Sequence, residues 1–173
     1  AKPLLPVDPT HLRQREAAIE TAESDVFWEG EMRLRQMFDS FAGDERSEYI
    51  LRHADFDAIC AARRANFGAI LNGMPKELHG IRSVFPVLTE ATVPSHFCLY
   101  AERRDELQAF LAERQIRSTV YWPVGPMVHP EGHPSVTYIY DHIVSVPCDQ
   151  RYQPSDMQRV AEAFVAYSEN FGR

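Results

Sequence analysis

The clearest helical pattern in the chain lies between residues 55 and 71. Apolar side chains recur there at intervals of three and four residues, which places them along one face of an α-helix. They are Phe56, Ile59, Cys60, Phe67, Ile70 and Leu71. Arg63 falls on the same face, where a charged side chain is unusual. Asn72-Gly73 and then Pro75 predict that the helix ends near residue 71.

Two further segments have the periodicity of amphipathic helices. The first covers residues 102–115, with Leu107, Phe110 and Leu111 facing inward. The second lies near the C-terminal end, and its apolar positions are Met157, Val160, Ala161, Phe164 and Val165. This last helix is predicted to begin at Ser155, because the sequence Ser-Asp-Met-Gln from there has the form of a capping box.

Between the helices the pattern changes to the alternation that is typical of half-buried β-strands. The predicted strands are residues 81–88, 95–100, 116–122 and 142–146. In the second strand, Phe97 and Leu99 share one face, and His96, Cys98 and Tyr100 share the other. Helices packed on one side of such a sheet are the natural outcome. The predicted fold class is therefore α+β, with a small mixed sheet of three to four strands packed against helices.

The N-terminal half of the chain is predicted to be mainly helical. Residues 1–8 are rich in proline and are expected to be extended. Asp8-Pro9 then resembles an N-cap followed by proline at the first helical position. Helices are expected to about residue 24 and again to about residue 41. The expected domain organisation is an extended segment and helical arm over residues 1–45, followed by a compact domain over residues 46–173.

The composition narrows the class of protein. The chain has 173 residues and a net charge of −7, which argues against sequence-independent binding of nucleic acid. It contains no apolar run of the ~18 residues that a membrane span requires. Three cysteines without CxxC spacing indicate reduced thiols and a cytoplasmic setting. Because the chain starts at AKPLLPVDP without methionine, we expect it to be a piece of a longer polypeptide.

Two familiar kinds of site are disfavoured by the sequence. His129 and His133 have a spacing that metal sites use, but Pro130 and Gly132 place them in a loop, and no metal site is predicted. Cys148 has no evident base partner, and its acidic neighbour Asp149 would raise the pKa of the thiol. No glycine-rich nucleotide-binding loop is present either.

Several residues allow both a structural and a functional interpretation. Arg63 either extends its guanidinium to solvent along the apolar face or contacts an anion inside the protein. Tyr121 and Trp122 either plug the end of a strand or form the wall of a substrate cleft. Arg151 either pairs with a nearby aspartate or faces an anionic ligand. The residues alone leave these alternatives open.

Four motifs occur in an order that resembles a known family. They are Arg63-Arg64-Ala65-Asn66-Phe67, Arg103-Arg104-Asp105-Glu106-Leu107, Val120-Tyr121-Trp122-Pro123 and the segment Ile143–Tyr152. Over about residues 45–167, this set resembles the C-terminal small domain of the DegT-type sugar aminotransferases, which have the aspartate-aminotransferase fold. The chain departs from the family pattern at Gln115, where the family usually has glycine, and at Tyr121, where it usually has histidine.

The resemblance implies a cofactor, pyridoxal 5'-phosphate (PLP), and a set of site residues. Lys2 would be the Schiff-base lysine, because residues 2–7 resemble the segment just after this lysine in one branch of the family. Ser47, in the loop before the arginine-rich helix, would contact the cofactor phosphate of a neighbouring subunit. Substrate would meet Tyr121, Trp122, the loop of His129, and Arg151.

The resemblance also implies partners and an activity. The partners are a large PLP-binding domain of the same polypeptide, a second subunit in a homodimer, and a small-molecule substrate. The parent enzyme would transfer an amino group, usually from glutamate, to a keto-sugar nucleotide or a similar carbonyl compound. Because the family's other cofactor contacts come from the large domain, we expect the isolated chain to be inactive.

Two other functions compete with this interpretation. One is a non-catalytic α+β module that binds a small ligand or pairs subunits. The other is scaffolding through the helices of residues 9–42, which predicts that oligomers are lost when this arm is deleted while the rest stays folded.

Overall fold

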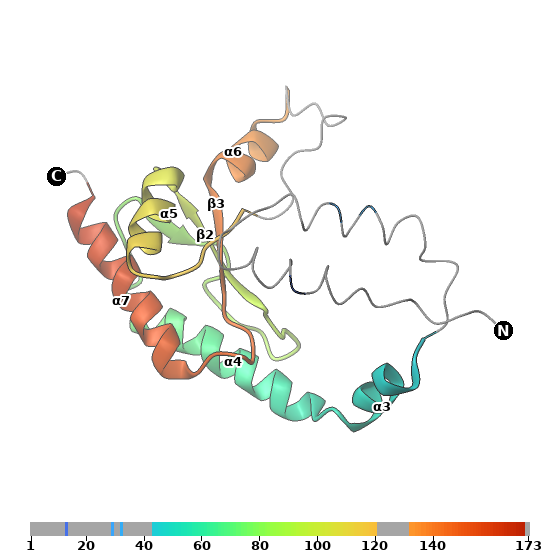
Figure 1. Ribbon diagram of the computed structural model, residues 1–173. Helices are drawn as coiled ribbons and strands as arrows, with labels where there is room; N and C mark the ends of the chain where they lie inside the picture. The colour runs from blue at the N-terminus through green and yellow to red at the C-terminus, as the bar shows by residue number, and fades with distance from the viewer. Residues whose placement is uncertain (1–12, 14–28, 30–31, 33–42, 121–131, 172–173) are drawn as a thin grey trace. The chain divides into compact units, whose positions relative to one another are not determined.

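A computed structural model of the chain describes residues 13, 29, 32, 43–120 and 132–171 (Figure 1). The chain divides into two compact units, Ala1–Ala54 and Asp55–Arg173. Of the first unit, helix α3 (Glu45–His53) is described as a whole element. Within the described residues, no helix combines the length and apolar character needed to cross a bilayer.

Helix α3 begins where the sequence led us to expect a loop. The Asp44 carboxylate caps the helix by accepting the backbone N–H of Ser47 at 2.9 Å. Glu45 and Glu48 in the first turn, with basic residues in the last turn, suit the helix dipole. None of the α3 residues is buried. Ser47 therefore lies in the first turn of an exposed helix, and the expectation that it lies in a loop is wrong.

The second unit is built on a three-stranded sheet with the order β1-β2-β3. The strands are β1 (Ile81–Ser83), β2 (His96–Ala101) and β3 (Ile143–Pro147), and both pairings are antiparallel. The expected α+β class is confirmed, but the expectation of a mixed sheet is wrong for the described strands. Alternating side chains identify the faces of a strand and not its direction, so the sequence could not supply this detail.

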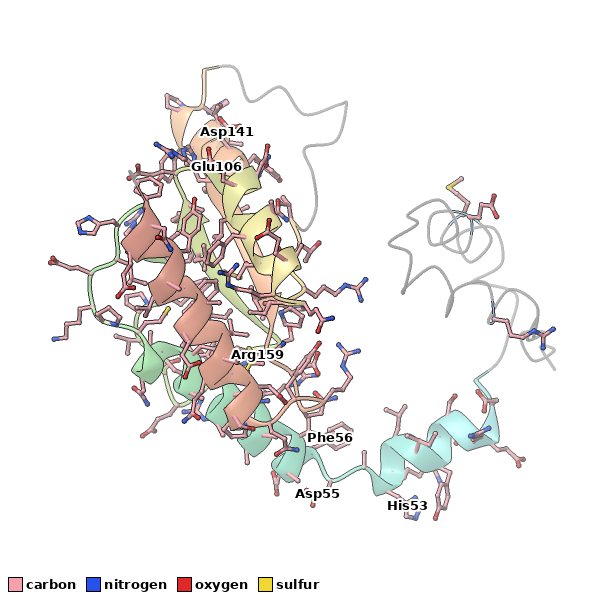
Figure 2. All side chains as sticks on the ribbon, turned by 60° about the vertical axis from the view of Figure 1, so that its left-hand side comes forward. His53, Asp55, Phe56, Glu106, Asp141 and Arg159 are labelled. Carbon is pink, nitrogen blue, oxygen red and sulfur yellow. The ribbon has the colours of Figure 1, made fainter. Side chains whose placement is uncertain are left out.

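Four helices complete the second unit: α4 (Phe56–Gly73), α5 (Arg104–Glu113), α6 (Pro134–His142) and α7 (Pro154–Asn170). Helices α4 and α7 pack against each other (Figure 1). Phe56 marks the exposed start of α4 (Figure 2). Asp55 caps this helix by accepting the N–H of Ala58 at 2.9 Å, so α4 begins where the sequence predicted.

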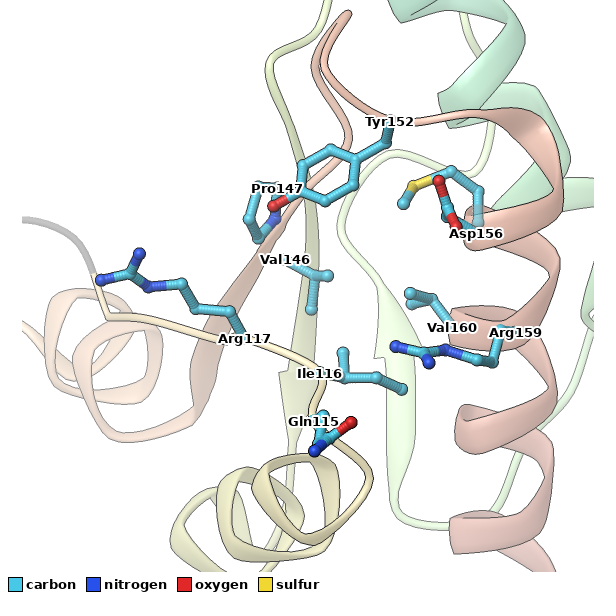
Figure 3. Close-up of a pocket in the computed structure, with 10 residues that line it drawn as sticks. Gln115, Ile116, Arg117, Val146, Pro147, Tyr152, Asp156, Arg159 and Val160 are labelled. Atoms are coloured by element: carbon cyan, nitrogen blue, oxygen red, sulfur yellow. The ribbon is translucent and has the colours of Figure 1, made fainter. Parts of the chain in front are cut away.

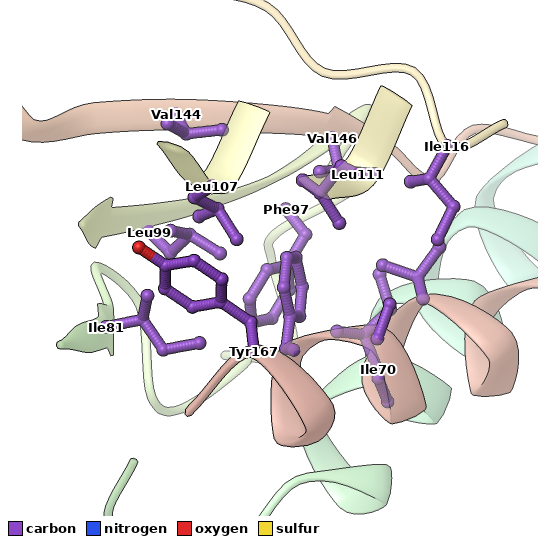
Figure 4. Close-up of a cluster of buried hydrophobic side chains, with 14 of the residues drawn as sticks. Ile70, Ile81, Phe97, Leu99, Leu107, Leu111, Ile116, Val144, Val146 and Tyr167 are labelled. Carbon is purple, nitrogen blue, oxygen red and sulfur yellow. The ribbon is translucent and has the colours of Figure 1, made fainter. Parts of the chain in front are cut away.

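The core lies between one face of the sheet and helices α4, α5 and α7 (Figure 4). Strand β2 buries Phe97, Leu99 and Ala101 and leaves the alternate positions half-buried, as its sequence predicted. The ring of Phe97 lies 4.9 Å from that of Phe67 in α4 and 6.2 Å from that of Phe164 in α7, centroid to centroid. These three rings join the sheet to both long helices.

Four segments differ from what the sequence predicted. Only residues 81–83 of the strand predicted over 81–88 are a strand, and residues 116–120 contribute a single bridge between Thr119 and Ser145. Helix α6 occupies a segment for which the sequence predicted neither a helix nor a strand. Helix α7 begins at Pro154, and the Asp156 carboxylate accepts the N–H of Gln153 at 2.9 Å, in place of the predicted Ser155–Gln158 box.

Candidate site at the Asp149 turn

The turn that follows β3 concentrates charged side chains around one buried carboxylate, and we call residues 148–152 the Asp149 turn. The side chain of Asp149 is 8% exposed, whereas that of Arg151 is 72% exposed. Arg151 donates to the Asp149 carboxylate through Nε at 2.8 Å and Nη2 at 2.6 Å. The backbone N–H of Arg151 adds a third bond at 3.0 Å. A guanidinium and a carboxylate are thus held in a bidentate pair.

Ionisation in the turn follows from these contacts. Hydrogen bonding from Arg151 lowers the pKa of Asp149 to about 2, so the group is a carboxylate at neutral pH. Burial, with a smaller contribution from Asp149, raises the pKa of the Cys148 thiol to about 12. Cys148 is therefore a neutral, buried thiol and does not have the character of a nucleophile.

The Asp149 turn is tied to the arginine-rich motif of α4. The side-chain amide of Asn66, which is fully buried, donates to the carbonyl oxygens of Asp149 and Tyr152 at 2.8 and 2.9 Å. Arg63 donates from Nε to the side-chain oxygen of Gln150 at 2.7 Å. Two motifs that lie far apart in the sequence therefore form one hydrogen-bonded unit.

The neighbouring Arg64 fixes a different loop. Its Nη1 donates to the carbonyl oxygens of Thr89, Glu90 and Thr92 at 2.7, 3.0 and 2.6 Å. This loop connects β1 with β2 and carries the exposed side chains of Phe85 and Val87 near its start. The arginine-rich motif thus holds two loops at once, a role that sequence reasoning missed because the acceptors are mostly backbone carbonyls.

Next to the turn, the face of the sheet away from the core carries polar and aromatic side chains. His96 is half-buried, and Ser95 Oγ lies 2.9 Å from its Nδ1. Burial lowers the pKa of His96, and the charge of Asp149 opposes this effect. On the same strand, the ring of Tyr100 contacts that of Tyr138 in α6 edge to face at 5.3 Å.

Several pockets lie on the second unit, and one of them borders the Asp149 turn through Tyr152. This pocket, of about 130 Å³, is also lined by residues 115–117, the end of β3 and the first turns of α7, with the side chain of Arg159 reaching toward Ile116 (Figure 3). A larger one, of about 780 Å³, lies between the end of α4 and β1 and includes Lys76 and Glu77. Arg63 and Arg151 line neither pocket.

The structure places two of the six predicted site residues. Arg151 belongs to the Asp149 turn, and of the two aspartates considered as its partner it pairs with Asp149. Ser47 lies in α3, and its hydroxyl donates to Asp44 at 2.5 Å. Lys2, Tyr121, Trp122 and His129 lie outside the described residues, and their roles remain predictions. The spacing of His129 and His133 is therefore not described as a pair.

Comparison with known proteins gives a result at the level of structure. No protein-family model matches the chain, and no curated protein matches it in sequence. The structure of DesV from S. venezuelae, in complex with a ketimine intermediate, matches 69% of this chain with 28% identity and a TM-score of 0.59. In fold, the chain resembles part of a DegT-type sugar aminotransferase. The expected family resemblance is thereby confirmed.

Two more distant aminotransferases share the fold. TlmJ from Streptoalloteichus hindustanus is 19% identical with a TM-score of 0.53, and matches 66% of this chain and 33% of its own. Spr1654 from Streptococcus pneumoniae, a sugar aminotransferase in its PMP form, is 15% identical with a TM-score of 0.57, and matches 66% and 32%. This chain thus spans about a third of the length of the aminotransferases that it matches.

The described part of this aminotransferase-like domain does not form a PLP site. A PLP enzyme needs a lysine, an acid at the pyridine nitrogen, a group stacked on the ring and a phosphate cup. Lys76 is the one lysine within the described residues, and it lies exposed between α4 and β1. The described walls of its pocket include no aromatic ring. The other lysine of the sequence is Lys2.

Proposed function

We propose that this chain is the C-terminal part of a cytoplasmic, PLP-dependent aminotransferase that acts on a keto-sugar nucleotide or a similar carbonyl compound. The observation that carries the proposal is the match to DesV over 69% of the chain. The contact between the Arg63-Asn66 motif and the Asp149 turn supports it, because these are two of the segments on which the resemblance rests.

In the proposed enzyme this domain closes over the substrate and the large domain of the same polypeptide binds PLP. Tyr121, Trp122, His129 and Arg151 would line the cleft, and Arg151 would face an anionic group of the substrate. Ser47 would approach the cofactor phosphate in the second subunit of a homodimer. When bound, PLP would supply the electron sink that amino transfer requires. The isolated chain is expected to lack activity.

The lysine content of the chain allows a direct test of the cofactor link. The purified chain is titrated with PLP, and the imine band is followed by absorbance and trapped by borohydride reduction. Wild type and the matched control Lys76→Ala are expected to form the trapped adduct at one site, and Lys2→Ala to lose it. Peptide mapping of the reduced adduct identifies the modified residue.

Each other outcome has a defined meaning. An equally strong imine band in Lys2→Ala would show that Lys2 is not the Schiff-base residue. The proposed role of the domain in closing over the substrate would be unaffected. To test that role, the polypeptide that includes the large domain is assayed for transfer of an amino group from glutamate to a keto-sugar nucleotide. The proposed function would fail if that polypeptide shows no PLP-dependent transfer to any carbonyl substrate of this class.

A further inference from the structure

We infer that Arg63, together with Arg151, forms a binding site for an oxyanion of a ligand, a carboxylate or a phosphate group, beside the Asp149 turn. The inference rests on the proposed function only for the biological identity of that ligand. The arrangement of charged groups around the turn carries it.

Arg63 presents the end of its guanidinium without an acceptor in the described part of the chain. Its Nε donates to Gln150 at 2.7 Å. Neither Nη1 nor Nη2 makes a hydrogen bond or ion pair with residues 43–120 or 132–171, although the side chain is only partly exposed. A half-buried arginine in this state is ready to donate two parallel hydrogen bonds to one oxyanion.

The Asp149 turn adds a second cation, Arg151, near Arg63. Asp149 holds Arg151 through two side-chain bonds, and Arg63 is close enough to influence the same carboxylate electrostatically. Two guanidinium groups therefore lie around one carboxylate at a hydrogen-bonded turn, and such an arrangement favours an anionic ligand.

The geometry indicates the class of ligand and leaves two sources for it. A guanidinium edge matches the oxygen spacing of a carboxylate and of a phosphate group. In an aminotransferase of the proposed kind, the amino donor carries the first and a nucleotide sugar carries the second. Glutarate and inorganic pyrophosphate present the same two chemistries without requiring a cofactor, so they serve as separate probes.

The test is a titration of the 173-residue chain with each probe, followed by NMR of backbone amides and arginine Nε groups. We expect saturable shifts at the Asp149 turn with at least one probe. Arg63→Gln and Arg151→Gln are expected to weaken binding roughly tenfold or more, since each removes charge-assisted hydrogen bonds. The matched control is Arg159→Gln, which removes the same charge from the exposed surface of α7 (Figure 2) and should leave binding within about twofold.

Arg63→Lys separates recognition by the guanidinium from simple attraction of charge. It keeps the charge and loses the fork, so binding should fall between wild type and Arg63→Gln. Dispersed spectra show that each variant is folded. The inference is overturned if neither probe saturates, or if Arg63→Gln and Arg159→Gln bind alike. Failure here leaves the PLP adduct at Lys2 unaffected, so the two proposals fail separately.

Discussion

Asp149 is a buried carboxylate whose contribution to stability requires ionisation. Hydrogen bonding from Arg151 lowers its pKa from 3.8 to about 2. Because the folded state has the lower pKa, the stabilisation is fully present above about pH 4 and is lost as the pH falls through 2. Arg151 is largely exposed, and screening by solvent reduces the expected contribution to about 1 kcal/mol.

The measurement is the free energy of unfolding in urea between pH 5 and pH 2. Wild type should lose about 1 kcal/mol more over this range than Asp149→Asn, which cannot ionise. Asp141→Asn, at an exposed position in α6, is the control and should follow wild type. Parallel curves for wild type and Asp149→Asn would contradict the prediction.

At single positions, the sequence showed where the chain departs from a pattern but not how residues far apart meet. Gln115 stands where the family usually has glycine, and its φ of 56° shows why glycine suits that position. Ile116 and Gln115 donate their N–H groups to the carbonyls of Leu111 and Ala112 at the end of α5, as in a Schellman motif. The bonds of Arg63 and Asn66 reach residues 83 to 87 positions away, and no local pattern reports them.

At the scale of elements, the close approach of α4 and α7 makes two glycines of one helix behave in opposite ways. A Cβ at Gly73 would lie 2.8 Å from that of Ala161, whereas a Cβ at Gly68 would meet nothing within 4 Å. Gly68→Ala should stabilise the protein by about 1 kcal/mol through helix propensity. Gly73→Ala should destabilise it by about 1–2 kcal/mol, because neither Cβ can turn aside. Urea denaturation of both variants checks the pair.

The comparison depends on the two substitutions changing the free energy of unfolding in opposite directions. If both variants were stabilised, α7 would have to move away from α4 at little cost. The contact would then be looser than the described packing of these two helices.

Elements with a strong apolar period were predictable, and those without one were not. Helix α4, strand β2 and helix α7 each bury one side and leave the other more exposed, so the period in the sequence reports the fold. Helix α6 buries no residue and has only nine residues, fewer than the window over which an apolar period can be recognised, and Pro134 at its start is also a loop signal. The N-cap of α7 was predicted at Ser155 and lies at Gln153, because proline at the first helical position competed with the capping-box pattern.

At the scale of the whole molecule, the second unit should fold by itself. The core residues within the described part of the chain belong to residues 55–173, and α3 buries none of its side chains. Residues 55–173 are therefore expected to unfold cooperatively in urea with the midpoint of the full chain and to keep its near-UV circular dichroism. Sedimentation of both forms shows whether residues 1–54 contribute to assembly. A broad, non-cooperative transition would contradict the prediction.

The fold of the whole unit was more accessible to sequence reasoning than its site. The α+β class follows from alternating and helical periods, and the structural match agrees with it. The site residues were inferred mainly from resemblance, and of them only Arg151 and Ser47 lie in the described part of the chain. Arg63 was recognised as unusual, but its partner Gln150 could be identified only after the turn was placed against α4.

The ties between α4 and the Asp149 turn have a consequence for the order of folding. Strands β1 and β2 are neighbours in sequence, whereas the Asn66 bonds close loops of 83 and 86 residues. Long loops are closed at an entropic cost that is repaid only after much of the intervening chain is ordered. The hydrogen bonds of Asn66 to the turn should therefore form after the transition state. A substitution at Asn66 should then speed unfolding and leave the rate of folding almost unchanged.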